Sequence, residues 1–73
     1  MLIKMKAKTI NRLKAVLAEK QITNKWLAEH MNLSTTTVSR WCMNKAQPSL
    51  ETLVEIAEIL KVDVKELIVS TKK

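Results

Sequence analysis

A chain of 73 residues with no glycine and one proline can form one small domain, but it lacks the residue type from which β folds build tight turns. Its single cysteine, Cys42, excludes an internal disulfide and fits a reducing, cytoplasmic location. The net charge of +6 is concentrated in residues 1–45, which hold nine Lys or Arg and two Asp or Glu, and this asymmetry favours a polyanionic partner.

Residues 1–8, MLIKMKAK, alternate apolar side chains with lysines. We expect an N-terminal arm here that is extended, paired as a strand or disordered. The segment has no apolar stretch long enough for a signal peptide. No run in the chain approaches the roughly 20 apolar residues that a membrane-spanning helix needs, so no membrane partner is expected.

The domain itself is predicted over residues 9–69 as an all-α bundle of four to five short helices, with a C-terminal tail at 70–73. The first helix is predicted over residues 9–20, with Thr9 as its N-cap. Its apolar face holds Ile10, Leu13, Val16 and Leu17.

A second, short helix is predicted over residues 24–31, with Thr23 as its N-cap. Its apolar face holds Leu27, Ala28 and Met31. Asn32 follows, and asparagine is the residue after glycine that most readily ends a helix in the left-handed conformation.

A third helix is predicted from the N-cap Ser34 to about Met43, with Asn44 as a second left-handed end. Its inner face is expected to hold Leu33, Val38 and Trp41. Residues 34–37 are four hydroxyl side chains in a row, although threonine is a mediocre helix former. This loss of helix propensity indicates a function on the exposed face.

Ser49, directly after Pro48, can cap a fourth helix, and Asp63 with Glu66 forms a capping-box pattern for a fifth. The fourth helix places on one face Leu50, Leu53, Ile56, Ala57 and Leu60. The fifth, shorter helix contributes the apolar residues Val64, Leu67 and Ile68.

Only the tripeptide NLS separates the second and third predicted helices, which is typical of a helix-turn-helix. In that unit the N-terminal turn of the second helix lies against base edges in the major groove of DNA. Short hydroxyl side chains let the helix approach, exchange hydrogen bonds with the bases and offer methyl groups to thymine. The hydroxyl run is therefore explained by DNA recognition.

Residues 10–68 resemble the Cro and lambda-type repressor (Xre-like) helix-turn-helix DNA-binding family of bacterial and phage regulators. The resemblance rests on three segments in the family's order and spacing: INRLKAVLAEKQIT, WLAEHMNLSTTTVSRW and QPSLETLVEIAEILKVDVKELI. It implies a compact, lambda repressor-like bundle. The chain departs from the family where Asn32 and Asn44 replace frequent glycines, and where Asn24 replaces a glutamine that often opens the second helix.

The resemblance also implies which residues contact double-stranded DNA. Base edges are expected to be contacted by Thr35, Thr36 and Arg40, which match the family's positions, and by Ser39, which lies on the same face. The DNA backbone is expected to be contacted by residues at the helix ends and at the edges of the unit: Asn24, Lys25, Ser34 and Lys45. Arginine can donate two hydrogen bonds to guanine O6 and N7. The alternative for Arg40 is a phosphate contact or a solvated surface charge, and the alternative for Thr35 and Thr36 is a pair of hydrated hydroxyls. Thr37 is expected to be partly buried or bonded to its own helix.

The other residues that could carry chemistry have structural explanations. Trp41 is expected in the core, Trp26 half exposed, His30 on the surface and Cys42 half buried. The residues Glu51, Glu55 and Glu58 are expected to form a solvated helix face. The sequence shows no nucleophile–base pair, phosphate loop or metal-ligand cluster. We therefore expect no catalytic residue, no metal, no cofactor and no enzyme activity.

The function favoured by these observations is sequence-specific binding of double-stranded DNA by a small, repressor-like transcription regulator. One domain contacts only a few base pairs, so a homodimer on a palindrome is expected. Candidate dimer surfaces are residues 1–7 and 64–73. Two alternatives remain: a module on the same fold that binds protein, including an antitoxin that grips a toxin, and a nonspecific nucleic-acid binder driven by charge.

Overall fold

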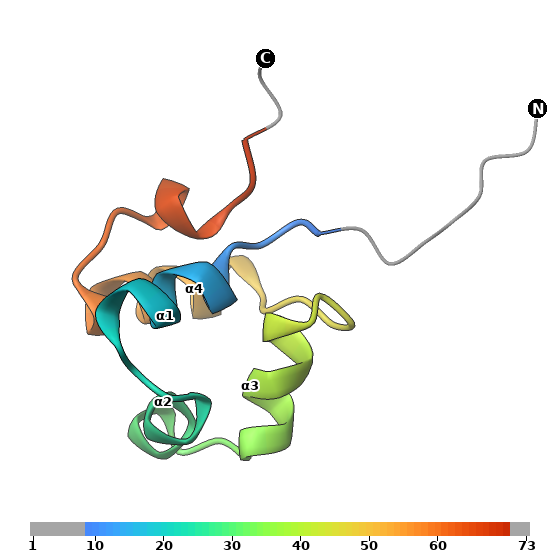
Figure 1. The fold of residues 1–73 in the computed structure, drawn as a ribbon, viewed down its shortest axis with the longest axis vertical. Coiled ribbons are helices and arrows are strands. Elements are labelled where there is room, and N and C mark those ends of the chain that lie inside the picture. Colours follow the sequence, from blue (N-terminus) through green and yellow to red (C-terminus); the bar gives the residue numbers. More distant parts are fainter. Residues whose placement is uncertain (1–8, 71–73) are drawn as a thin grey trace, which may run out of the picture.

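The computed structural model describes residues 9–70, which form four α-helices and a short 3₁₀-helix (Figure 1). The elements are α1 (Leu13–Lys20), α2 (Asn24–Met31), α3 (Thr35–Cys42), α4 (Leu50–Leu60) and the 3₁₀-helix η1 (Val64–Leu67). The predicted arm at residues 1–8 and residues 71–73 of the predicted tail lie outside the described residues. The all-α, helix-turn-helix fold class is confirmed. No helix within the described range is long and apolar enough to cross a membrane.

Helices α2, α3 and α4 begin at the hydroxyl side chains that the sequence predicts as N-caps. Each cap oxygen accepts a hydrogen bond, 3.0 or 3.1 Å long, from a backbone N–H in the first turn. The donors and caps are Trp26 to Thr23, Thr37 to Ser34, and Thr52 to Ser49. Asp63 accepts from the N–H of Lys65 at 3.0 Å, although the helix that follows is 3₁₀ rather than α. These bonds satisfy N–H groups that have no partner inside the helix.

The turns after the α-helices use left-handed backbone at residues other than glycine. The φ angle lies between 57° and 61° at Gln21, Asn32, Asn44 and Lys61. The residue that follows each of these positions donates its backbone N–H to the carbonyl of the residue five places before itself, as in a Schellman motif. The sequence predicts this conformation at the two asparagines. It does not predict it at Gln21 and Lys61, whose residue types have no marked left-handed preference.

Helix α1 begins later than the sequence predicts, at Leu13 rather than directly after Thr9. The side-chain oxygen of Asn11 accepts a hydrogen bond from the Leu13 N–H at 3.0 Å, so Asn11 and not Thr9 sets the start. Ile10, expected on the inner face of this helix, is 49% exposed. The apolar spacing at Ile10 fits a helix, but the backbone there is engaged elsewhere.

The residues before α1 pair with the segment that follows η1. The N–H of Arg12 donates to the carbonyl of Leu67 at 2.8 Å, and the N–H of Val69 donates to the carbonyl of Ile10 at 2.8 Å. Asn11 and Ile68 form an isolated antiparallel bridge. Figure 1 shows the two segments side by side above α1 and α3. This long-range pairing replaces the first turn of the predicted helix.

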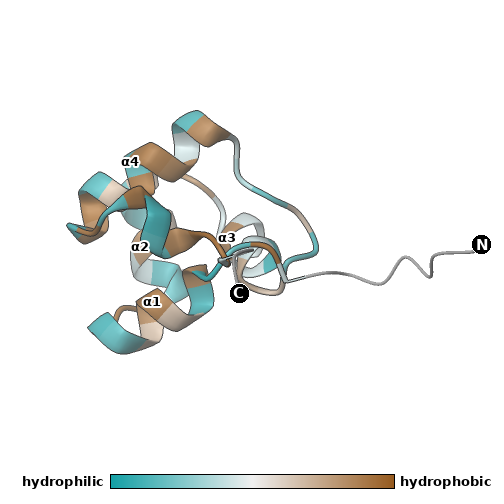
Figure 2. Ribbon diagram, turned by 90° about the horizontal axis from the view of Figure 1, so that it is seen from above, coloured by the Kyte–Doolittle hydropathy of each residue, from teal (hydrophilic) through white to brown (hydrophobic). Residues whose placement is uncertain are grey.

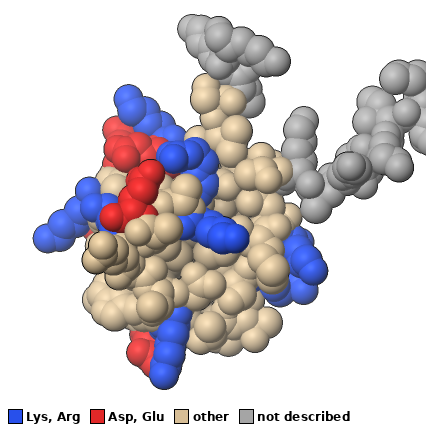
Figure 3. All heavy atoms as spheres, viewed as in Figure 1, with Lys and Arg blue, Asp and Glu red and all other residues tan. Residues whose placement is uncertain are grey.

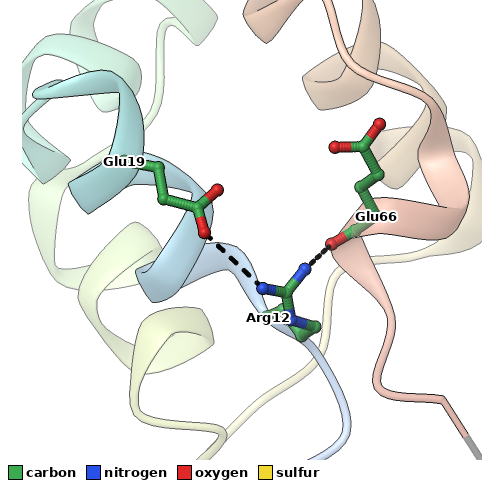
Figure 4. A network of polar contacts seen from close by, with 3 residues as sticks. All are labelled: Arg12, Glu19 and Glu66. Atoms are coloured by element: carbon green, nitrogen blue, oxygen red, sulfur yellow. Dashed lines mark hydrogen bonds and ion pairs between the residues drawn. The ribbon is translucent and has the colours of Figure 1, made fainter.

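Arg12 adds side-chain contacts between α1 and η1 (Figure 4). Its Nη1 donates to the backbone carbonyl of Glu66 at 2.8 Å, and its Nη2 lies 3.8 Å from Oε2 of Glu19. The side chains of Arg12 and Glu19 are 39% and 66% exposed. Because exposed ion pairs contribute little, the hydrogen bond to the backbone is the more important of the two contacts.

A cluster of three amide side chains, the Asn11–Asn44–Gln47 network, joins the end of α3 to the segment before α1. The Oδ1 of Asn44 accepts from the backbone N–H of Ile10 at 2.8 Å, from that of Asn11 at 2.9 Å and from Nε2 of Gln47 at 3.2 Å. The Nδ2 of Asn11 donates to the carbonyl of Trp41 at 2.9 Å and to Oε1 of Gln47 at 2.8 Å. Asn11 is 4% exposed, so its burial is compensated by these bonds.

The core lies between the apolar faces of the helices, seen as brown segments along α1 and α4 in Figure 2. Its buried members are Leu13, Val16, Leu17, Leu27, Ala28, Val38, Trp41, Cys42, Leu53, Ile56, Ala57, Leu60 and Leu67. Besides Ile10, three further apolar residues assigned to inner faces from the sequence are substantially exposed: Leu33 at 40%, Leu50 at 76% and Ile68 at 39%. Leu33 lies in the turn before α3. Leu50 lies in the first turn of α4, which stays exposed although the apolar spacing of the sequence extends into it.

Substitution of Asn44 tests its two roles separately. We expect Asn44→Gly to lower the free energy of unfolding by about 2 kcal/mol, because glycine keeps the left-handed backbone and loses only the side-chain hydrogen bonds. Asn44→Ala should lose about 1 kcal/mol more, since alanine is strained in that conformation. Urea denaturation measures both. A glycine variant as stable as the wild type would show that the network contributes nothing.

Two leucines of α4 offer a matched test of the core. Leu53 is 7% exposed and Leu50 is 76% exposed. We expect Leu53→Ala to lower the free energy of unfolding by about 2–5 kcal/mol, and Leu50→Ala by less than about 0.5 kcal/mol. Equal losses for the two variants in urea denaturation would contradict the placement of Leu50 outside the core.

Candidate nucleic-acid interface

Helices α2 and α3 form the helix-turn-helix, and α3 lies at the margin of the bundle (Figure 1). Asn32 takes the left-handed conformation that turns the chain, and the N–H of Leu33 donates to the carbonyl of Ala28 at 2.8 Å. Ser34 then caps α3. The turn is therefore fixed by the hydrogen bonds that residues 33 and 34 make with the adjoining ends of α2 and α3.

The two faces of α3 differ in exposure. Val38, Trp41 and Cys42 are buried against the core. Thr35, Thr36 and Arg40 are exposed on the other side, while Ser39 is intermediate. Of the four residues expected to contact base edges, three therefore have exposed side chains, whereas Ser39 is partly covered by α2.

The hydroxyls at the start of α3 divide into two groups. Ser34 Oγ accepts from the Thr37 N–H at 3.1 Å, and the two side-chain oxygens lie 2.9 Å apart. Thr37 is partly buried, as the sequence predicts. Thr35 and Thr36 remain exposed beside them. Ser34 and Thr37 therefore hold the helix end, while Thr35 and Thr36 present their hydroxyls outward.

Asn24, expected at the DNA backbone, makes contacts inside the protein. Its Nδ2 donates to Oγ of Ser39 at 3.2 Å, and its Oδ1 accepts from Sγ of Cys42 at 3.4 Å. Burial raises the pKa of the Cys42 thiol, and Lys14 lowers it to a smaller extent. The thiol is therefore protonated near neutral pH and is available as a donor. Sequence patterns missed this link because it depends on how α2 and α3 are placed.

The charge around α3 is favourable for a polyanion. Residues 30–50 contain no Asp or Glu but include Arg40 and Lys45. Lys25 and Lys45, both expected at the DNA backbone, are exposed in α2 and after α3. On the face seen in Figure 3, acidic side chains gather at the upper left and appear again at the lower left edge, while the lower right shows none. The lower right is where α3 lies in the same view in Figure 1, so a phosphate backbone that approaches from there meets no carboxylate on this face.

The remaining chemically versatile residues do not form a second site. Trp26 is 43% exposed and stacks on His30 with ring centroids 4.6 Å apart. Cys42 is more buried than expected, at 7% exposure. Within residues 9–70 no group of three or more His, Cys, Asp or Glu residues could hold a metal ion.

Comparisons with known proteins agree with this arrangement. The sequence profile of the family described as a Cro/C1-type HTH DNA-binding domain matches residues 12–73. A protein from Bacteroides fragilis, proposed to bind DNA, has a crystal structure similar to this fold with a TM-score of 0.81. The two sequences are 62% identical over 82% of this chain and 97% of that one. A comparison with curated proteins gave no match.

Proposed function

Because the chain belongs to the Cro/C1-type helix-turn-helix DNA-binding family, we propose that it is a small, repressor-like transcription regulator that recognises specific sequences in double-stranded DNA. The observation that carries the proposal is the outer face of α3. That face exposes Thr35, Thr36 and Arg40, and the chain has no acidic residue from position 30 to position 50. A free thiol at Cys42 fits a reducing, cytoplasmic location.

In this proposal the exposed side chains of α3 contact the major-groove edges of the bases. Arg40 donates to guanine O6 and N7, and the methyl groups of Thr35 and Thr36 pack against thymine while their hydroxyls exchange hydrogen bonds with neighbouring bases. Ser39 contributes from the same side with a partly covered hydroxyl. These residues supply sequence preference, because hydrogen-bond patterns in the major groove distinguish all four base pairs.

Lys25 and Lys45 contact phosphates on either side of α3, and the N-terminus of α3, capped by Ser34, favours a third phosphate. Such contacts position the protein without selecting a sequence. Asn24 could reach a phosphate only with the part of its amide that Ser39 and Cys42 leave unused. Most of the hydrogen-bonding capacity of Asn24 is therefore directed inside the protein.

The regulator is proposed to act as a homodimer, because a single recognition helix contacts too few base pairs to select one site. The two copies would place their α3 helices about 34 Å apart, one turn of DNA, on a palindromic site. Ile68, 39% exposed in the segment after η1, supports a dimer surface within residues 64–73.

A protein partner, as in an antitoxin, is the second candidate function. It is favoured by Leu50 and Val54, which are 76% and 47% exposed one turn apart on α4. Exposed apolar pairs of this kind can contact another protein. This alternative does not explain the uncharged and basic surface of α3, so we place it second.

The first experiment is selection of binding sequences from a random pool of DNA duplexes, followed by a salt titration. We expect a palindromic consensus bound at least about 10³-fold more tightly than a scrambled duplex, with both affinities falling as salt rises. Enrichment of no sequence, with equal salt dependence for both duplexes, would leave a nonspecific binder or a protein-binding module.

Arg40 and Lys45 should differ in their effects on the selected duplex. We expect Arg40→Ala to weaken binding by about 1–3 kcal/mol and to relax the preference at one base pair. Lys45→Ala should weaken binding to every duplex alike and reduce the salt dependence. Titrations against single-base-pair variants of the duplex measure both effects. Equal losses across all duplexes for both variants would remove Arg40 from the base-contacting set.

A further inference from the structure

The side chain of Asn24 lies between the two helices of the helix-turn-helix and uses both ends of its amide toward α3. Its Nδ2 donates to Oγ of Ser39 at 3.2 Å, and its Oδ1 accepts from Sγ of Cys42 at 3.4 Å. Ser39 and Cys42 are three residues apart and thus lie on one face of α3. The first residue of α2 is therefore tied to the second half of the recognition helix.

The two contacts together fix which way the amide faces. The thiol of Cys42 donates to the carbonyl oxygen of Asn24. The amino end of the amide is then left to face Ser39. Because the Cys42 residue is 7% exposed, its Sγ–H has little access to water as an alternative acceptor. With its Oδ1 engaged by Cys42, Asn24 acts as a donor toward Ser39.

The contact with Asn24 also limits the hydroxyl of Ser39. A serine hydroxyl has one hydrogen and two lone pairs. Asn24 occupies one lone pair, so the hydrogen of Ser39 must point away from Asn24. Ser39 is partly exposed beside Arg40. Its hydroxyl can therefore donate to a group that approaches α3 from outside.

We propose that Asn24 is a positioning residue for DNA recognition, which holds α3 against α2 and orients the Ser39 hydroxyl to donate to an acceptor on the major-groove edge. The acceptors available there are purine N7, guanine O6 and thymine O4. The inference rests on the proposed function, since it assigns to Asn24 an effect on sequence preference. It replaces the expectation that Asn24 contacts a phosphate.

The test is a double-mutant cycle on the selected duplex and its single-base-pair variants. Ser39→Ala identifies the base pair at which preference depends on the hydroxyl. We expect Asn24→Ala to relax the preference at that same base pair by a similar factor, on the order of tenfold. The double variant should discriminate no worse there than Ser39→Ala alone, because both changes remove one interaction.

A second variant changes the hydrogen-bond direction and keeps the size of the side chain. Asn24→Asp still accepts from Cys42, but it cannot donate to Ser39, and the serine hydroxyl would turn inward to the carboxylate. We expect the preference at the same base pair to be lost. The matched control is Lys25→Gln, which makes an equal change in charge at the next residue and should weaken binding to all duplexes without changing their ratios.

Three results would overturn the proposal. Asn24→Ala could weaken all duplexes equally and add to the effect of Ser39→Ala, which would make Asn24 a phosphate contact. Ser39→Ala could leave every base preference unchanged, or Asn24→Asp could retain full discrimination. Failure of the wild-type protein to discriminate between duplexes would instead reject the proposed function together with this inference. Urea denaturation of each variant ensures that folded protein is compared.

Discussion

The side chain of Asn44 joins the end of α3 to the segment that leads into α1. Its backbone ends α3 in the left-handed conformation, with φ of 57°, and its Oδ1 accepts from the N–H groups of Ile10 and Asn11. The segment held in this way leads directly into α1 and pairs with residues 67–69. The C-terminal end of the recognition helix is thus anchored to both ends of the described chain, while its N-terminal end faces outward.

The parts of the fold that depend on neighbouring residues could be predicted from the sequence. The caps Thr23, Ser34 and Ser49 and the left-handed turns at Asn32 and Asn44 follow from interactions within a few residues. These interactions fix the helix boundaries regardless of the rest of the molecule. The family resemblance and its fold could be identified for the same reason, because the motif consists of local signals at fixed spacing.

The start of the first helix is predicted wrongly because a distant contact competes with a local pattern. Ile10 has the spacing of a helical residue, but its N–H is bonded to a side chain 34 positions away. The site shows the same division. Helical periodicity is enough to place Arg40 on an exposed face, whereas the contact of Asn24 with Ser39 requires the relative positions of two helices. The long-range geometry that sets the recognition helix cannot be obtained from periodicity.

The left-handed turns without glycine have a consequence for the entropy of recognition. A left-handed residue other than glycine costs about 1 kcal/mol in the folded state. Glycine at the same place would leave the unfolded chain freer and cost about 0.4–1 kcal/mol, so for asparagine, which tolerates the left-handed region better than alanine does, the net effect on stability is small. The two choices differ in the conformational freedom of the turns, since the backbone of Asn32 and Asn44 can adopt far fewer conformations than that of glycine. A recognition helix bounded by such turns is already ordered before it meets DNA, and little conformational entropy remains to be lost on binding.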